Sequence, residues 1–168
     1  PDFLLKCNGM WAFCLWDRKL KKALLGRDRF GVKPLFYTSL NSKNLIFGSE
    51  MKSITPFLDN IEPSKNIDVL TQGIFNYEST DECVINGIKR LEPGYYLIYD
   101  DNRIIKKRYW NTLDHIQLSN TSYSNQVESW RSLFLDSVKI RMRADVSIGS
   151  TLSGGLDSSS IVAAISHI

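Results

Sequence analysis

The sequence predicts a mixed α+β region followed by the opening of an α/β region. Short apolar segments at close spacing indicate antiparallel strands in the first part of the chain. A polar stretch at 111–123, rich in Ser, Thr and Asn, is typical of a linker between domains. Beyond it, a helix, a strand, a glycine-rich loop and a second helix follow one another. We therefore expect one domain over 1–110 and the start of another over 124–168.

Paired strands are expected near the beginning of the chain. Residues 10–17 are almost continuously apolar, which favours a strand buried on both faces. The basic run RKLKK at 18–22 is interpreted as a solvated hairpin turn, with a nucleic-acid-binding patch as the alternative. KALLGRDRFG is expected to be a second strand that runs into a glycine turn. A third strand begins at Pro34, and a turn at Asn41–Ser42 leads into a fourth.

Helical segments and one further hairpin follow before the linker. EMKSITPFL should form a helix or helical turn that ends near Pro56. Residues 66–77 have apolar side chains at helical spacing, with Asn66 or Ser64 as the N-cap. YYLIYD and RIIKKRYW should pair as a hairpin whose turn contains Asp101-Asn102.

The last part of the chain should contain two helices joined by a strand and a loop. A helix is predicted over 126–142, because Asn125 can act as N-cap and Glu128 completes a capping box. DVSIGSTLS, residues 145–153, is predicted to be a strand. The next helix begins within SSIVAAISHI. The helix over 126–142 should pack through one apolar face, made of Val127, Trp130, Phe134 and Val138.

SGGLDSS, residues 153–159, is the strongest candidate site. Gly154-Gly155 would let backbone N–H groups approach an anion, and the helix that follows adds a partial positive charge. Asp157 fits such a site if Mg²⁺ lies between its carboxylate and the anion. A glycine turn with ordinary helix capping is the alternative. The hydroxyl donors of such a site would be Ser153, Ser158 and Ser159. The segment is not a P-loop, because it lacks the Lys of that motif.

Composition limits the other functions. The formal net charge is only +3, and the longest apolar runs are too short to span a bilayer. The three cysteines, Cys7, Cys14 and Cys83, form no Cys/His cluster, so they are expected to be structural residues in a reducing cytoplasm. RDRFGVKPL gathers Arg27, Asp28, Arg29 and Lys33, and FGSEMKS contains Glu50. For RDRFGVKPL, a strand-to-turn junction with a local salt bridge is favoured over a catalytic role. A structural role is likewise favoured for Glu50.

These segments together resemble one enzyme family. SGGLDSS matches the pyrophosphate-binding loop (PP-loop, SGGxDS) of ATP pyrophosphatases, and its surroundings resemble the start of the synthetase domain of glutamine-hydrolysing asparagine synthetases. NGMWAFCLWD, GRDRFGVKPLFY and FGSEMKSI resemble later strands of that family's class II glutamine amidotransferase domain, and LEPGYYLIYD and KKRYW the run into its linker. The resemblance implies the C-terminal part of an αββα N-terminal-nucleophile-type glutaminase sandwich, followed by the start of a parallel α/β PP-loop synthetase domain.

The resemblance also implies a reaction and its ligands. The family makes asparagine from aspartate, glutamine (or ammonia) and ATP through a β-aspartyl-AMP intermediate, releasing glutamate, AMP and pyrophosphate. ATP would contact Leu152, Ser153, Gly154, Gly155, Leu156, Asp157, Ser158 and Ser159, with Asp157 linked to Mg²⁺. A cytoplasmic enzyme without nucleic-acid or membrane partners is expected, with a homodimer of the full-length protein as one option.

The family's glutaminase nucleophile is an N-terminal Cys, whereas Pro1 stands first here and Cys7 and Cys14 are internal. No catalytic residue for glutamine hydrolysis is therefore assigned, and the chain is expected to be an inactive and poorly stable internal fragment. Two alternatives stay open. One is a related enzyme with another acceptor, such as a β-lactam synthetase or an enzyme that amidates peptides or sugars. The other is a non-catalytic nucleotide-binding relative.

Overall fold

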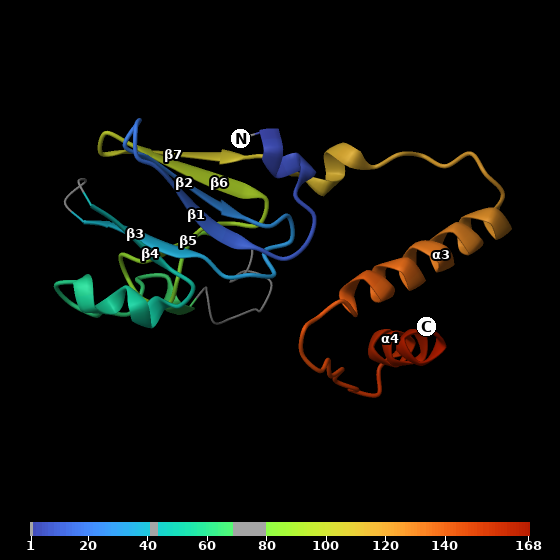
Figure 1. The fold of residues 1–168 in the computed structure, drawn as a ribbon. Coiled ribbons are helices and arrows are strands. Elements are labelled where there is room, and N and C mark those ends of the chain that lie inside the picture. The colour runs from blue at the N-terminus through green and yellow to red at the C-terminus, as the bar shows by residue number, and fades with distance from the viewer. Residues whose placement is uncertain (1, 41–43, 69–79) are drawn as a thin grey trace. The chain divides into compact units, whose positions relative to one another are not determined.

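The computed structural model describes residues 2–40, 44–68 and 80–168 (Figure 1). These residues belong to two compact units, 1–116 and 117–168. The predicted turn at Asn41–Ser42 lies outside the described residues, as does most of the predicted helix over 66–77. Of this range, Asn66, Ile67 and Asp68 are described, and the last two of them are helical.

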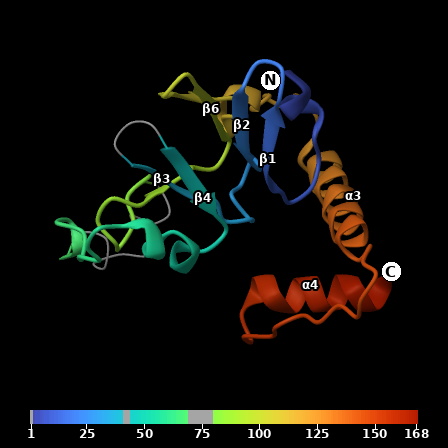
Figure 2. The same cartoon turned by 60° about the vertical axis from the view of Figure 1, so that its left-hand side comes forward.

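The first unit contains two antiparallel sheets, which Figures 1 and 2 show from two sides. One has the order β1-β2-β6-β7 and the other β4-β3-β5. The pairings of β1 with β2, β3 with β4, and β6 with β7 confirm the predicted hairpins. The strands are β1 (Ala12–Asp17), β2 (Lys22–Arg27), β3 (Phe36–Leu40), β4 (Asn44–Gly48), β5 (Lys89–Arg90), β6 (Tyr95–Asp100) and β7 (Arg103–Arg108).

Local turn chemistry explains two of these hairpins. Asp101 and Asn102, between β6 and β7, have φ values of 44° and 63°. This is the backbone that a two-residue turn needs to match the twist of the strands, and Asp and Asn tolerate it. Between β1 and β2, the Asp17 carboxylate accepts the N–H groups of Lys19 and Leu20, both at 2.9 Å. The basic run at 18–22 is therefore a hairpin turn, as predicted.

The apolar core of the first unit joins residues of both sheets. Leu25 of β2 and Leu97 of β6 are fully buried, and they pack in one cluster with Tyr37 of β3. The other buried members of this cluster are Ala23, Leu35 and Leu91. Side chains alternate along a strand, so the neighbours of these residues lie on the opposite face of the four-stranded sheet. There they form an apolar row that crosses all four strands in register: Leu15, Leu24, Ile98 and Ile105.

Burial of 10–17 on both faces was a wrong prediction. Leu15 of β1 is 52% exposed and Trp16 is 55% exposed. The reason is that Leu15 belongs to the apolar row on the outward face of the sheet, opposite the core that Cys14 packs against. An apolar run does not by itself show whether both faces of a strand are covered.

Short 3-10 helices form around Pro56, namely η2 (Met51–Ser53) and η3 (Thr55–Phe57). The second of them ends one residue after Pro56, which confirms the predicted helical turn that ends near this residue. Pro56 lies in the first turn of η3. Proline suits that position because the N–H it lacks would have no partner there. Two further 3-10 helices are η1 (Asp2–Lys6) and η4 (Thr112–His115).

The second unit contains α3 (Tyr123–Arg141) and α4 (Leu156–His167), which contact one another. Ser122 is the N-cap of α3, and its hydroxyl accepts the N–H of Asn125 at 3.4 Å. The predicted Asn125 cap is therefore wrong by almost one turn. Of the predicted apolar face, Val138 is buried, whereas Trp130 is 66% exposed and stacks on Phe134.

The strand predicted over 145–153 is also absent from this unit. A strand is defined by hydrogen bonds to a neighbouring strand, and no described segment pairs with these residues. The parallel sheet of an α/β domain accordingly stays a prediction.

Gly31 offers a test of the packing beside β2. Its φ is +64°, and an added Cβ would lie 2.7 Å from Cγ of Pro93 and 2.9 Å from Cζ of Arg27. Gly31→Ala should lower the free energy of unfolding by about 3 kcal/mol, because backbone strain and overpacking add. Gly87→Ala is the matched control, since φ there is +80° but no atom lies within 4 Å. Gly87→Ala should lower the free energy of unfolding by only about 1–2 kcal/mol, because backbone strain acts there without a clash. Urea unfolding of the full-length protein, followed by tryptophan fluorescence, measures both; equal losses would contradict the predicted clash.

Candidate functional site

The predicted phosphate-binding residues lie in one continuous stretch at the start of α4. Gly154 has φ +81°, in the left-handed region that glycine enters without strain. Gly155 is extended and acts as the N-cap, and α4 begins at Leu156. The stretch is open to solvent, and Leu156 is 83% exposed. The glycine turn therefore leaves the helix N-terminus accessible.

The donors at this helix N-terminus are backbone amides and hydroxyls. No side-chain hydrogen bond caps α4. The N–H groups of a first helical turn have no partner within the helix, and they attract anions through the helix dipole. Among the hydroxyls, that of Ser153 lies 3.0 Å from that of Ser158, and that of Ser160 donates to the Leu156 carbonyl at 2.8 Å.

Asp157 is the one carboxylate of the loop. It is exposed and has no hydrogen bond or ion pair with any described residue. In the described part of the chain, no three His, Cys, Asp or Glu residues cluster as metal ligands. A single free carboxylate fits Mg²⁺, which proteins often hold through one or two carboxylates plus substrate phosphates. The loop is therefore compatible with a magnesium ion that arrives with a nucleotide.

The charges of RDRFGVKPL have a structural role. The Asp28 carboxylate is 1% exposed and accepts four backbone N–H groups at 3.0–3.2 Å. A carboxylate enclosed by amide donors has its acceptor positions filled, and it has no access to a substrate. The favoured interpretation as a strand-to-turn junction is thus supported, whereas the local salt bridge predicted with it stays a prediction, because these bonds of Asp28 go to backbone groups. The four donors are Trp11, Phe30, Val32 and Lys33.

Arg27 complements Asp28 by donating to backbone carbonyls. Its Nε donates to Lys33 O at 2.7 Å, its Nη1 to Leu91 O at 2.7 Å and its Nη2 to Gly31 O at 2.6 Å. We call Arg27, Asp28 and the backbone groups they bind the Arg27–Asp28 cluster. It closes the turn after β2 and attaches the segment before β6 to that turn.

Arg29 and Glu50 also have local partners. The Arg29 guanidinium lies 4.3 Å from the centre of the Trp110 ring and donates from Nη2 to Leu5 O at 2.6 Å. Glu50 forms an exposed ion pair with Lys52 at 2.7 Å, which contributes little in water. Neither contact points to chemistry in the described part of the chain.

The cysteines are free thiols in partly or fully buried positions. Cys7 and Cys14 are half-buried, and Cys83 is buried. Burial raises the pKa of Cys83 to about 11 and also raises that of Cys14. Because the thiolate is the reactive form, these pKa shifts oppose nucleophilic chemistry at Cys14 and Cys83.

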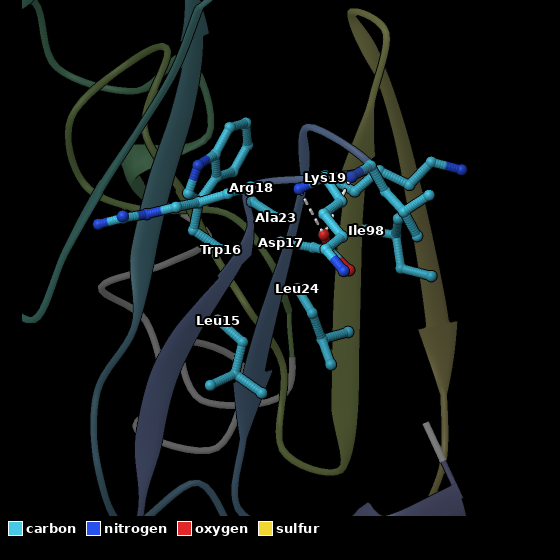
Figure 3. Close-up of a pocket in the computed structure, with 10 residues that line it drawn as sticks. Leu15, Trp16, Asp17, Arg18, Lys19, Ala23, Leu24 and Ile98 are labelled. Atoms are coloured by element: carbon cyan, nitrogen blue, oxygen red, sulfur yellow. Dashed lines mark hydrogen bonds between the residues drawn. The ribbon is translucent and has the colours of Figure 1, made fainter.

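A hollow of about 610 Å³ opens on the four-stranded sheet of the first unit (Figure 3). Leu15, Leu24 and Ile98 of the apolar row line it. Its carboxylate, Asp17, is already bonded to the hairpin turn. The hollow thus offers apolar surface and no poised catalytic group.

Separately, no described helix is long and apolar enough to cross a membrane.

Sequence reasoning missed several partners of the Arg27–Asp28 cluster. Gly94 donates its N–H to Asp28 O at 3.0 Å and accepts the N–H of Tyr109 at 2.8 Å. The Tyr109 hydroxyl donates to Arg27 O at 2.9 Å. The sequence predicts the Pro93-Gly94 turn. It does not predict that this turn binds the turn after β2, because no local residue pattern indicates a contact between segments so far apart along the chain.

Asp28→Asn tests the electrostatics of the Arg27–Asp28 cluster. The amide has one acceptor oxygen where the carboxylate has two, so buried N–H groups lose their acceptor. We expect the free energy of unfolding to fall by about 3 kcal/mol. The exposed Asp59→Asn control should change it by less than about 0.5 kcal/mol. Urea unfolding of the full-length protein distinguishes the two, and a change no larger than that of Asp59→Asn would show that the charge is dispensable.

Tyr109 predicts a pH dependence of stability. Burial, and secondarily the charge of Asp28, raises the pKa of Tyr109 from 10.0 to about 12. The folded state thus favours the neutral phenol, and this stabilisation is complete below pH 10 and is lost as the pH rises toward 12. Tyr109→Phe should cost about 1 kcal/mol at pH 7 and make the alkaline loss of stability shallower. Urea midpoints at pH 7, 10 and 11 measure this, with exposed Tyr123→Phe as control; parallel curves for wild type and Tyr109→Phe would argue against it.

Comparison with known proteins identifies the family. The glutamine amidotransferase domain matches residues 1–110, and asparagine synthase matches residues 129–168. The chain is 37% identical over 166 residues to a putative glutamine-hydrolysing asparagine synthetase 2 of Methanocaldococcus jannaschii, covering 96% of this chain and 32% of the relative.

Two further relatives extend the comparison. Glutamine-hydrolysing asparagine synthetase 3 of Bacillus subtilis is 36% identical over 93% of this chain and 25% of its own length. Amidase chyE of Penicillium rubens is 34% identical over 99% of this chain and 25% of its own length. The chain thus spans about a third or less of these relatives. Its mixed helices and antiparallel sheets agree with the first match. The predicted resemblance is confirmed: the chain belongs to the glutamine amidotransferase domain family and continues into a segment of asparagine synthase type.

Proposed function

We propose that the full-length protein makes asparagine from aspartate, glutamine and ATP. The observation that favours this most is the order of two matches along one chain. A glutamine amidotransferase domain over 1–110, which would supply ammonia, is followed after a short interval by an asparagine synthase segment over 129–168 that contains SGGLDSS. Several relatives of the chain are named asparagine synthetase (glutamine-hydrolysing), one of them as putative.

We assign the chain accordingly to parts of two domains. Residues 1–110 would be the C-terminal part of the amidotransferase domain, 111–123 a linker, and 124–168 the start of the synthetase domain. The boundary between the compact units, after residue 116, falls within the proposed linker. An αββα sandwich is supported by the core between the two sheets and by the apolar row on the outward face, which a helical layer would cover.

Water would first hydrolyse the side-chain amide of glutamine in the amidotransferase domain, giving glutamate and ammonia. The synthetase chemistry then has two steps. A β-carboxylate oxygen of aspartate attacks the α-phosphorus of ATP, and pyrophosphate leaves. Ammonia then attacks the β-carbonyl carbon, and AMP leaves with the electron pair of the broken C–O bond. The loop at the start of α4 would contribute to the first step, because its backbone N–H groups and hydroxyls stabilise charge that develops on the departing pyrophosphate.

Magnesium would be held at Asp157 together with the phosphates, and it would neutralise phosphate charge when bound. The other residues of the loop, from Leu152 to Ser159, would surround the phosphates as the sequence predicts. We also propose a cytoplasmic enzyme whose partners are small molecules, with a homodimer as one option for the full-length protein.

A second candidate function keeps the ATP chemistry and changes the acceptor. Two relatives that cover 99% of this chain are named amidases, chyE of Penicillium rubens and chry2 of Gibberella zeae, at 34% and 33% identity. Amidotransferase and PP-loop segments like these therefore occur in proteins not named for asparagine. The acceptor of this protein would then be a carboxylate other than aspartate.

The full-length protein tests these proposals directly. With glutamine, MgATP and aspartate, we expect equal amounts of asparagine, glutamate, AMP and pyrophosphate, measured by chromatography. Asp157→Asn should lower asparagine formation by about 10- to 100-fold, the factor of one charge-assisted interaction. The exposed Glu128→Gln control on α3 should leave the rate unchanged.

The outcomes separate the alternatives. Pyrophosphate release that depends on another carboxylate, and not on aspartate, would favour the second function. No pyrophosphate release with any acceptor would leave a non-catalytic nucleotide-binding relative.

A further inference from the structure

The chain leaves the four-stranded sheet through a close backbone contact after β7. Gly94 accepts the N–H groups of Tyr109 and Trp110, at 2.8 Å and 3.2 Å. The φ of Gly94 is +74°, and an added Cβ would lie only 2.6 Å from the carbonyl oxygen of Trp110. Because glycine has no Cβ, the two segments can approach this closely. The turn before β6 therefore fixes the path of residues 109–110.

The side chain of Trp110 connects the turn after β2 with the end of η4. The guanidinium carbon of Arg29 lies over the indole, 4.3 Å from the ring centre. The His115 ring stacks on the same indole, with centres 4.0 Å apart and 9° between the planes. We call these three residues the Trp110 stack. Nε of Arg29 is buried without a hydrogen-bond partner among the described residues, so the ring supplies attraction that a hydrogen bond would otherwise give.

Local hydrogen bonds order the residues between Trp110 and His115. Arg108 donates from Nε to Trp110 O and from Nη2 to Oδ1 of Asn111, both at 3.0 Å. Asn111 donates from Nδ2 to Oδ1 of Asp114 at 2.8 Å. Trp110 donates from Nε1 to Oγ1 of Thr112 at 3.1 Å. Each of these bonds is exposed and weak in water by itself, but together with the Trp110 stack they hold the whole segment on the first unit.

The chain changes character after His115. Residues 116–120 form no helix or strand (Figure 1), and every residue from 116 to 122 is exposed. The side chain of Leu118 is 94% exposed. Side-chain hydrogen bonds stay local here, as between the hydroxyls of Ser119 and Thr121 at 2.8 Å. The polar stretch that the sequence predicts to be one linker therefore has an ordered part, which ends at His115, and an open part over 116–122.

We infer that Trp110 is a positioning residue for the transfer of ammonia, because its stack with Arg29 and His115 keeps the free linker between the two domains short. This inference rests on the proposed function, in which one domain makes the ammonia that the other consumes. The free linker has about seven residues (116–122) with the stack and about twelve (111–122) without it. Because the effective concentration of tethered domains falls roughly as the −3/2 power of linker length, loss of the stack should lower it about twofold.

Variants of the full-length protein test the inference through two readouts. One is the molar ratio of glutamate to asparagine with glutamine as nitrogen source, and the other is the rate of asparagine formation with saturating ammonium. Trp110→Ala and His115→Ala should each raise the ratio about twofold, because more ammonia escapes before it reacts. With ammonium, both variants should match wild type, since free ammonia does not depend on the linker.

Two further variants serve as controls. His115→Phe keeps an aromatic ring over the indole and should restore the wild-type ratio. Gln117→Ala changes an exposed residue beside the Trp110 stack but outside it, and it should leave both readouts unchanged. If Trp110→Ala does not fold, His115→Ala supplies the test, because the His115 side chain is exposed.

Hydrogen exchange measures the order of the segment independently of catalysis. The N–H of Asp114 donates to Asn111 O at 3.1 Å within η4. It should exchange about three- to tenfold faster in His115→Ala, the factor expected for the loss of one aromatic pair. Gln117→Ala should exchange at this position like wild type.

Three results would overturn the inference. The first is wild-type exchange in His115→Ala, which would show that the stack orders nothing. The second is faster exchange with an unchanged ratio, which would show that the order has no role in transfer. The third is an equal loss of asparagine with glutamine and with ammonium, which would place the effect on the fold or the synthetase step. Failure of the proposed function differs from all three: wild type would form no asparagine from either nitrogen source, which refutes the role in transfer, while exchange would still judge the stack.

Discussion

The first unit depends on satisfying two adjacent charges that are buried at the end of β2. Arg27 and Asp28 are 3% and 1% exposed. A buried charge without partners costs several kcal/mol, so each must be enclosed by groups of the opposite polarity. Backbone amides enclose the carboxylate, and backbone carbonyls enclose the guanidinium. Because backbone groups cannot be moved without moving the chain, this requirement fixes the path of several segments at once.

The segments held in this way come from distant parts of the chain. Trp11 precedes β1, Leu91 follows β5, and Tyr109 follows β7. Trp11 joins Asp28 through two hydrogen bonds, and Leu91 and Tyr109 each join Arg27 through one. Gly94 joins both Asp28 and Tyr109. The side-chain charges thus hold Trp11 and Leu91, while the backbone carbonyls of Asp28 and Arg27 hold Gly94 before β6 and Tyr109 after β7. The apolar core between the sheets provides the larger share of burial, but it is less directional, so the cluster supplies specificity that the core alone lacks.

What could be predicted from the sequence follows the range of each interaction. The Asp101-Asn102 turn and the glycine turn before α4 were predicted because the residue types themselves permit the backbone. The N-cap of α3 was misplaced because Ser122 and Asn125 are both good caps within one turn. The strand at 145–153 and the two-sided burial of β1 failed for another reason: both depend on neighbours that the local pattern does not specify. The Ser153–Ser158 contact likewise depends on rotamers, which spacing does not reveal.

The two glycine-containing polar segments, RDRFGVKPL and SGGLDSS, illustrate how structure separates a folding element from a binding element. Their compositions invite the same hypothesis of chemistry. In the first, the Asp28 carboxylate and the Arg27 guanidinium are buried and bonded to backbone groups. In the second, Asp157 and the hydroxyl of Ser159 are exposed and have no partner among the described residues, and no side chain caps the helix. Exposed polar groups left unpaired beside a helix N-terminus can exchange water for a ligand at little cost, whereas buried and satisfied groups cannot. By that criterion the second segment is the one suited to a phosphate.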